Sequence, residues 1–170
     1  MGKTKSPDFD AIIQKAVNAG RIQGSSTAKD AYKATERRLY ALPVLRQKIL
    51  DDREKLDEIR THGTRERSKS IVRFSRSGYR ISPEEMLEAI IRDLEATIAA
   101  DEYEIECMER AIARFENDTY FETVSGRYFN EYEDADIAES LGCSGVTVWK
   151  QRNRIVQKIA VILYGSQAVR

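Results

Sequence analysis

The sequence predicts an all-α protein in which a long antiparallel helical hairpin, packed like a coiled coil, precedes a C-terminal helix-turn-helix domain. Three observations support this prediction. The 170 residues include only 3 prolines and 9 glycines, so long helices meet few interruptions. Apolar residues recur in heptads through the middle of the chain, and a pair of capped helices follows near its C-terminus. The expected regions are 1–26, 27–118 and 119–170.

The first region is expected to hold a short helix and a linker. Residues 8–19 have the amphipathic pattern of a helix, and residues 20–26 are rich in glycine and serine. A longer helix then begins near Ser26 or Thr27 and runs towards Arg60. Pro43 lies inside it and has no amide hydrogen to donate, so the sequence predicts a kink or a short break there.

The clearest helix of the sequence begins after Ser82. Ser82 and Glu85 have the spacing of a capping box, with Pro83 at the first helical position. Apolar residues then alternate at steps of four and three, with isoleucine at every a position: Ile91, Ile98, Ile105 and Ile112. Asp101 departs from the apolar d series, as Asp52 does in the preceding helix. We interpret both as polar residues that set the register of the helical seam.

Charges beside the two seams predict how the helices pair. The e positions of the second helix are all glutamate: Glu88, Glu95, Glu102, Glu109 and Glu116. Those of the first helix are arginine: Arg46, Arg53 and Arg60. In an antiparallel pair of helices, e positions face e positions, so we expect these two helices to pair in antiparallel fashion. The pairing could occur within one chain or between two chains, and homo-oligomerisation through the heptads therefore remains open. Exposed ion pairs contribute about 0.2–1 kcal/mol each, so they select the partner. The alternative is that these charged residues simply lie on solvent-exposed helix faces and do not select a partner.

A basic segment separates the two helices. Residues 60–81 contain seven basic residues and one acidic residue, and they lack helical periodicity. They are expected to form a loop, 61–81, or a small β-hairpin. Its basic side chains are candidate phosphate contacts: Arg65, Arg67, Lys69, Arg73 and Arg76. Pairing with residues 82–118, which carry twelve acidic and three basic residues, is the alternative.

The C-terminal region predicts three helices. They are expected over Thr119–Phe129, Ala135–Leu141 and Gly145 to about Leu163. Asp134 and Ser144 are the expected caps of the second and third helices, and Gly142 suits the left-handed residue between them. A short helix, a glycine-led turn and a longer helix form a helix-turn-helix. Its expected inward residues are Ile137, Ala138, Leu141, Cys143, Val148, Ile155 and Ile159.

The outward face of the last helix predicts binding to double-stranded DNA. No acidic residue occurs from Gly145 onwards. Arginine and lysine pair with guanine edges, glutamine with adenine, and a threonine methyl group contacts thymine. The helix N-terminus favours a phosphate. Trp149 is interpreted as a packing or protein-contact residue. The expected DNA-binding residues are Ser144, Thr147, Lys150, Gln151, Arg152, Arg154 and Lys158.

Two stretches carry a resemblance to known families. IAESLGCSGVTVWKQRNRIVQKI resembles region 4 of bacterial sigma factors, the helix-turn-helix that reads the −35 element. AYKATERRLYALPVLRQKI, residues 31–49, resembles the N-terminal signature of phage and prophage late-gene regulators of the ArpU and RinA type. The resemblance implies a cytoplasmic, nucleoid-associated activator that binds DNA and acts with host RNA polymerase.

Two other DNA-binding roles remain open, a stand-alone sigma factor and a small terminase-like packaging protein. An enzyme is not expected, because the sequence has no phosphate-binding glycine loop and no metal-ligand cluster. No cofactor is expected for the same reason. His62 is interpreted as a solvated histidine, and Cys107 and Cys143 as unpaired thiols. No run of 18 apolar residues predicts a membrane span.

Overall fold

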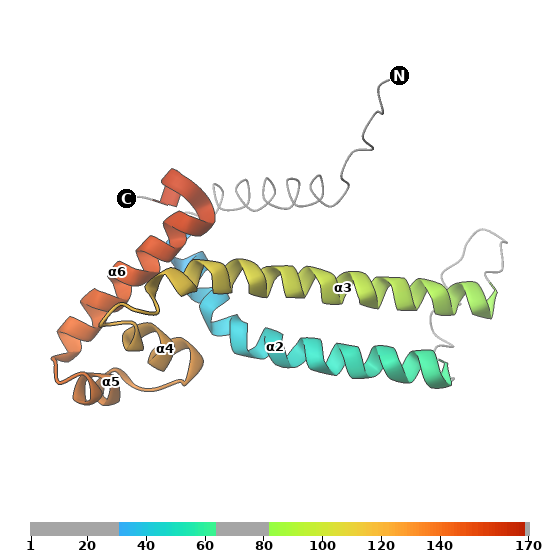
Figure 1. Ribbon diagram of the computed structural model, residues 1–170, viewed down its shortest axis with the longest axis horizontal. Coiled ribbons are helices and arrows are strands. Elements are labelled where there is room, and N and C mark those ends of the chain that lie inside the picture. The colour runs from blue at the N-terminus through green and yellow to red at the C-terminus, as the bar shows by residue number, and fades with distance from the viewer. Residues whose placement is uncertain (1–30, 64–81, 169–170) are drawn as a thin grey trace, which may run out of the picture. The chain divides into compact units, whose positions relative to one another are not determined.

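The computed structural model describes residues 31–63 and 82–168, and every secondary-structure element in these ranges is a helix (Figure 1). The helix expected over 8–19 and the linker at 20–26 lie outside the described residues. So do the candidate phosphate contacts Arg65, Arg67, Lys69, Arg73 and Arg76. None of the helices within these ranges has the length and apolar content that a membrane span requires.

The chain divides into two compact units. One unit is Ala41–Cys107, and the other joins the described residues before Ala41 to those from Met108 onwards. Helices α2 (Ala31–His62) and α3 (Pro83–Ile112) each contribute to both units. The sequence had suggested one helical region over 27–118 and a separate one from 119. The structure differs because the first turns of α2 pack with the C-terminal helices.

Helix α2 is continuous, with Pro43 in its interior, so of the predicted kink or short break at this proline the break is absent. An interior proline costs about 3 kcal/mol through one lost hydrogen bond and a clash. Burial of Leu39 and Leu42 beside it offsets this cost, because both side chains are almost fully removed from solvent. The helix ends at Gly63, which has a φ of 70° and donates its amide to the carbonyl of Ile59 at 2.9 Å.

The predicted start of α3 is confirmed. The amide of Ser82 donates to the Glu85 carboxylate at 2.9 Å, and the amide of Glu85 donates to Ser82 Oγ at 3.1 Å. Pro83 is the first residue of the helix, where a missing amide hydrogen costs nothing. The capping box therefore fixes the position at which α3 begins.

The core of the unit Ala41–Cys107 is formed by the heptad positions of both helices. Ile49, Leu56 and Ile59 of α2 pack with Leu94 and Ile98 of α3, and each is at most 9% exposed. Other apolar side chains of α3 surround this cluster: Leu87, Ile90, Ile91 and Ile105. The heptad pattern therefore identified the residues that the two helices bury against each other.

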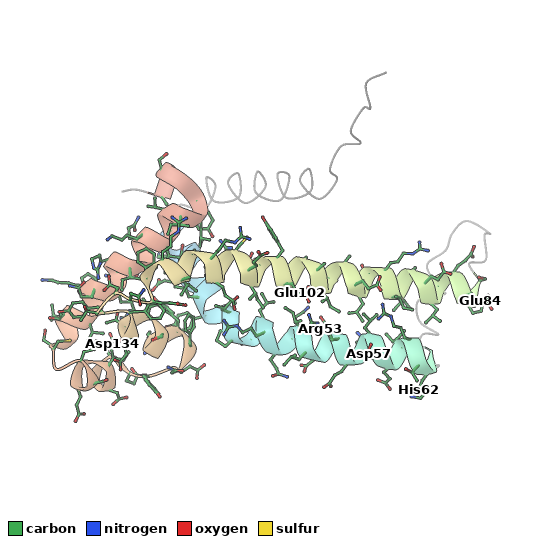
Figure 2. All side chains as sticks on the ribbon, in the orientation of Figure 1. Arg53, Asp57, His62, Glu84, Glu102 and Asp134 are labelled. Carbon is green, nitrogen blue, oxygen red and sulfur yellow. The ribbon has the colours of Figure 1, made fainter. Side chains whose placement is uncertain are left out.

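Ion pairs flank this core. Arg53 lies 2.5 Å from Glu102 (Figure 2). Arg60 lies 2.5 Å from Glu95. Residue numbers rise along α2 as they fall along α3, so the contacting stretches run in opposite directions. Arg53 and Arg60 therefore meet the glutamate row, as the sequence predicts.

The two aspartates that interrupt the heptads share one cation. Lys48 Nζ donates to Asp52 at 2.7 Å and to Asp101 at 2.6 Å. The hydrogen bonds to Asp101 and then Asp52 raise the pKa of Lys48 above its ordinary value. Lys48 thus links the polar positions of the two seams, as residues that set the register would require.

The C-terminal unit contains three packed helices, α4 (Glu122–Phe129), α5 (Asp134–Ser140) and α6 (Gly145–Tyr164). Two short 3-10 helices, η2 (Ala113–Phe115) and η3 (Gly165–Ala168), lie before and after them. The fully buried core side chains are Val124, Tyr128, Ile137, Val148, Ile155, Val156 and Ile159. Four of the seven predicted inward residues are among them, whereas Ala138, Leu141 and Cys143 are half-buried.

The first turns of α2 pack against this unit. Ala31 and Ala34 contact the buried cluster of Ala160, Tyr164 and Ala168, where small side chains permit a close approach. Nearby, the Tyr128 hydroxyl of α4 donates to Glu36 at 2.7 Å. Burial, followed by this bond to Glu36, raises the pKa of Tyr128. These contacts attach residues 31–40 to the C-terminal helices.

Candidate nucleic-acid interface

The turn between α5 and α6 is built as the sequence predicts. Gly142 has a φ of 60°, a conformation that favours glycine, and its amide donates to the Glu139 carbonyl at 3.1 Å. Ser144 is the N-cap of α6, because its Oγ accepts from the Thr147 amide at 3.2 Å. The hydroxyls of Ser144 and Thr147 also lie 3.0 Å apart. The first turn of α6 is therefore capped by the protein itself.

Asp134 has a different role from the one predicted. It is the first residue of α5, while the N-cap is Glu133, whose side chain makes no capping bond. The Asp134 carboxylate instead accepts two hydrogen bonds from Arg152 of α6, at 2.5 and 2.9 Å. These bonds lower the pKa of Asp134 below its ordinary value. The pair joins the start of α5 to the middle of α6.

Arg152 therefore does not belong to the DNA-facing set in which the sequence analysis placed it. Its residue exposure is only 9%, and both terminal nitrogens are committed to Asp134. A guanidinium in this position cannot reach a base edge without breaking a bidentate ion pair. Helical periodicity placed Arg152 at the edge of the outward face. Its ion pair with Asp134, 18 positions earlier in the sequence, turns its side chain inward instead.

Arg154 and Gln151 form a second network. Arg154 Nη2 lies 2.8 Å from both carboxylate oxygens of Asp118, and Arg154 Nε donates to Gln151 Oε1 at 2.6 Å. The bond from Arg154 lowers the pKa of Asp118. The Arg154 side chain stays 35% exposed. Two predicted DNA contacts are thus partly accessible but engaged with each other and with Asp118.

The most exposed apolar residues of α6 lie in its first two turns. Val146 is 63% exposed and Trp149 is 55% exposed. Lys150 is also exposed, and the spacing of these three residues places them on one face. Trp149 therefore does not pack in the core. Val146 was absent from the predicted set, although its helical spacing from Trp149 and Lys150 was a signal that could have identified it.

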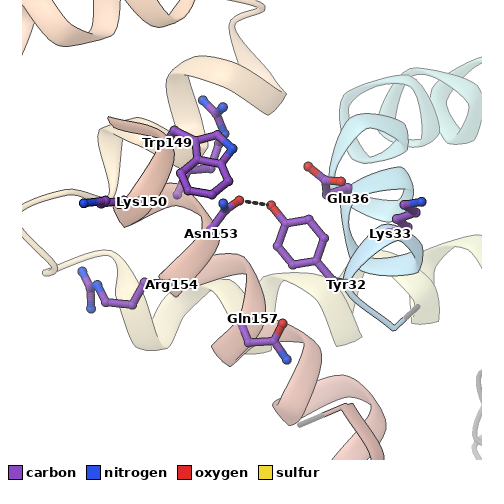
Figure 3. Close-up of a pocket in the computed structure, with 9 residues that line it drawn as sticks. Tyr32, Lys33, Glu36, Trp149, Lys150, Asn153, Arg154 and Gln157 are labelled. Carbon is purple, nitrogen blue, oxygen red and sulfur yellow. Dashed lines mark hydrogen bonds between the residues drawn. The ribbon is translucent and has the colours of Figure 1, made fainter. Parts of the chain in front are cut away.

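A cleft of about 720 Å³ lies between the first turns of α2 and the stretch of α6 from Trp149 to Gln157 (Figure 3). Trp149, Asn153 and Gln157 line it from α6, and Tyr32 lines it from α2 together with Lys33 and Glu36. The Tyr32 hydroxyl donates to Asn153 Oδ1 across the cleft. Burial, then the charge of Glu36, raises the pKa of Tyr32 to about 12.

This cleft limits how much of α6 is open to a partner. From Asn153 onwards, one face of α6 is covered by α2. The turns before Asn153 carry the exposed Gly145, Val146, Trp149 and Lys150. Lys158 is also exposed, further along the helix. The exposed residues of α6 are therefore concentrated in its N-terminal third, and beyond it only Lys158 and Ile162 are exposed among the described residues of the helix.

Within the described ranges, no group of three or more histidine, cysteine or acidic residues is arranged to hold a metal ion. Cys107 and Cys143 are free thiols, each partly exposed, and His62 is exposed at the end of α2. Comparisons with protein-family models, characterised proteins and solved structures give no match to this chain. The function is therefore argued from the geometry of α5 and α6.

Proposed function

We propose that this chain is a sequence-specific DNA-binding transcription regulator that places the N-terminal third of α6 in the major groove. The observation that carries the proposal is the accessible, capped start of α6, which contains no acidic residue and rises from a buried three-helix core. An α-helix with side chains is about 10–12 Å across, which matches a major groove about 12 Å wide. In this proposal α5, the turn and α6 act as a helix-turn-helix.

Charge supports this direction of approach. Lys150 and Lys158 are exposed on α6, while Asp136 and Glu139 are exposed on α5. Phosphates are attracted to the lysines and to the positive end of the helix dipole, and they are repelled by the carboxylates of α5. The backbone of the duplex would therefore follow α6 and avoid the acidic face of α5.

The unit Ala41–Cys107 has a supporting role in this proposal. We interpret its paired stretches of α2 and α3 as an antiparallel helical hairpin that supports the reader or joins two copies of it. The resemblance to sigma region 4 and to late-gene regulators of the ArpU and RinA type supports a regulator that acts with RNA polymerase. Since a packaging protein or a sigma factor would use the same reader, the first test concerns DNA binding itself.

Selection of fragmented bacterial and prophage DNA on the full chain, at near-physiological salt, tests the proposal. We expect one enriched duplex that competes against random DNA. The double variant K150A/K158A should bind it more weakly, with a salt slope that is smaller by about one per lost phosphate contact. The control is K55A, which removes an exposed lysine from the C-terminal half of α2. No enriched duplex, or equal binding by all three proteins, would contradict the proposal.

A further inference from the structure

The polar side chains that commonly read bases are largely committed in this protein. Arg152 is paired with Asp134, and Arg154 is bonded to Asp118 and Gln151. Along the accessible start of α6, the large side chains that reach solvent are Val146, Trp149 and Lys150. Two of these three are apolar. A helix that enters a major groove with such a surface has few donors and acceptors to offer to base edges.

Resting on the proposed function, we infer that Val146 and Trp149 read the C5 methyl groups of thymine. Thymine is the only standard base that presents an apolar group in the major groove. Val146 and Trp149 are three residues apart, so they lie on one face and offer adjoining apolar surfaces. Contact with thymine methyl groups would remove both apolar surfaces from water. This burial lowers the free energy of the complex, and contact with a polar base edge would not.

Three observations favour a duplex over a protein as the occupant of this surface. Lys150 lies on the same face, and α6 carries no acidic residue. Gly145 faces open space, because a Cβ built there meets no atom within 4 Å. Glycine at the first turn lets a phosphate approach the helix backbone closely. A surface with these features complements duplex DNA, which has anionic phosphates along its backbone and apolar thymine methyl groups at the floor of its major groove.

The length of the accessible surface sets the size of the thymine patch. The contact between Tyr32 and Asn153 marks where α2 begins to cover one face of α6, beyond its second turn. The residues from Gly145 to Gln151 then span about 10 Å at 1.5 Å per residue. With base pairs about 3.4 Å apart, this length covers about three steps. The methyl-sensitive thymines should therefore lie within about three adjacent base pairs.

Replacement of thymine by deoxyuridine in the enriched duplex tests this inference, because it removes only the C5 methyl group. We expect about a fourfold loss of affinity for each contacted methyl group, confined to adjacent positions. The variants V146A and W149A should bind the original duplex more weakly and should no longer distinguish thymine from deoxyuridine at those positions. W149F should keep part of the discrimination, since it keeps an aromatic surface.

The outcomes separate the inference from the function on which it rests. A duplex in which every thymine is replaced, bound with unchanged affinity, would overturn methyl reading and leave DNA binding intact. The same holds if V146A and W149A keep the full response to deoxyuridine. Absence of any DNA binding would overturn the proposed function and the inference together. Both side chains are exposed, and circular dichroism of each variant verifies that the helices are retained.

Discussion

At the residue scale, the pair of Arg152 and Asp134 determines how α5 is held against α6. Arg152 is nearly buried, and its side chain makes two bonds to one carboxylate. Replacing Arg152 by leucine should lower the free energy of unfolding by about 1.5–3 kcal/mol, the usual range for hydrogen bonds to charged groups. Urea denaturation measures this difference. The exposed control K158A should change it by less than about 0.5 kcal/mol, and an equal effect of both variants would contradict the assignment.

The same carboxylates predict how stability depends on pH. Hydrogen bonds from Arg154 and Arg152 lower the pKa of Asp118 and Asp134, respectively, in the folded chain. The unfolded chain then binds these protons at higher pH, near the ordinary aspartate value of about 3.9. Their contribution is therefore complete above that value and is lost as the pH falls through the lower pKa values of the folded state.

Measurements of unfolding between neutral pH and about pH 3 test this dependence. We expect the double variant D118N/D134N to be less stable at neutral pH and to lose less further stability on acidification. A double variant that keeps the acid sensitivity of the parent would show that other carboxylates are responsible. D136N, which changes an exposed aspartate of α5, is the matched control.

Single positions also mark the limit of sequence reasoning. Periodicity identified the buried Val148, Ile155 and Ile159, because local spacing alone decides which face a residue shares. It could not identify the inward turn of Arg152, since that depends on a carboxylate brought close by the fold. The exposure of Trp149 was likewise not predictable, because aromatic residues are more often buried than left on a surface.

At the element scale, three helix ends predicted from local motifs are confirmed, whereas the cap predicted at Asp134 is not. The capping box at Ser82, the cap at Ser144 and the glycine at Gly142 are all present. Of the kink or short break predicted at Pro43, the break is absent, because packing on both sides of a proline can hold a helix together at a cost that a sequence window does not reveal. The packing of α2 against α6 was not predicted, because Tyr32 and Asn153 lie 121 residues apart and no local pattern connects them.

The paired stretches of α2 and α3 give a prediction about register. Arg53 and Glu102 are each about half exposed and lie 2.5 Å apart. The variant R53E should therefore lower stability by no more than about 1 kcal/mol. Adding E102R should restore most of the loss in a double-mutant cycle. A control swap that pairs R53E with E88R, two heptads away from Glu102, should restore nothing. Equal rescue by both swaps would contradict the observed register.

At the scale of the whole molecule, charge is distributed so that one surface can meet a polyanion. The chain has no net charge, with 28 basic and 28 acidic residues, yet α6 contains no acidic side chain. Two of its four cations are neutralised by Asp118 and Asp134, so the proposed binding of DNA would depend on few phosphate contacts. Apolar contact and shape must then supply much of the specificity, which is consistent with the proposed reading of thymine methyl groups.

The most direct test of the central claim uses Trp149 as a native probe. It is the only tryptophan of the chain and lies 55% exposed on the surface proposed to enter the groove. Acrylamide quenching of its fluorescence is measured while the enriched duplex is added and binding is followed by anisotropy of labelled DNA. Quenching should fall in proportion to the DNA bound, because the groove shields the indole. Full binding with unchanged quenching would show that another surface binds DNA and would contradict the account.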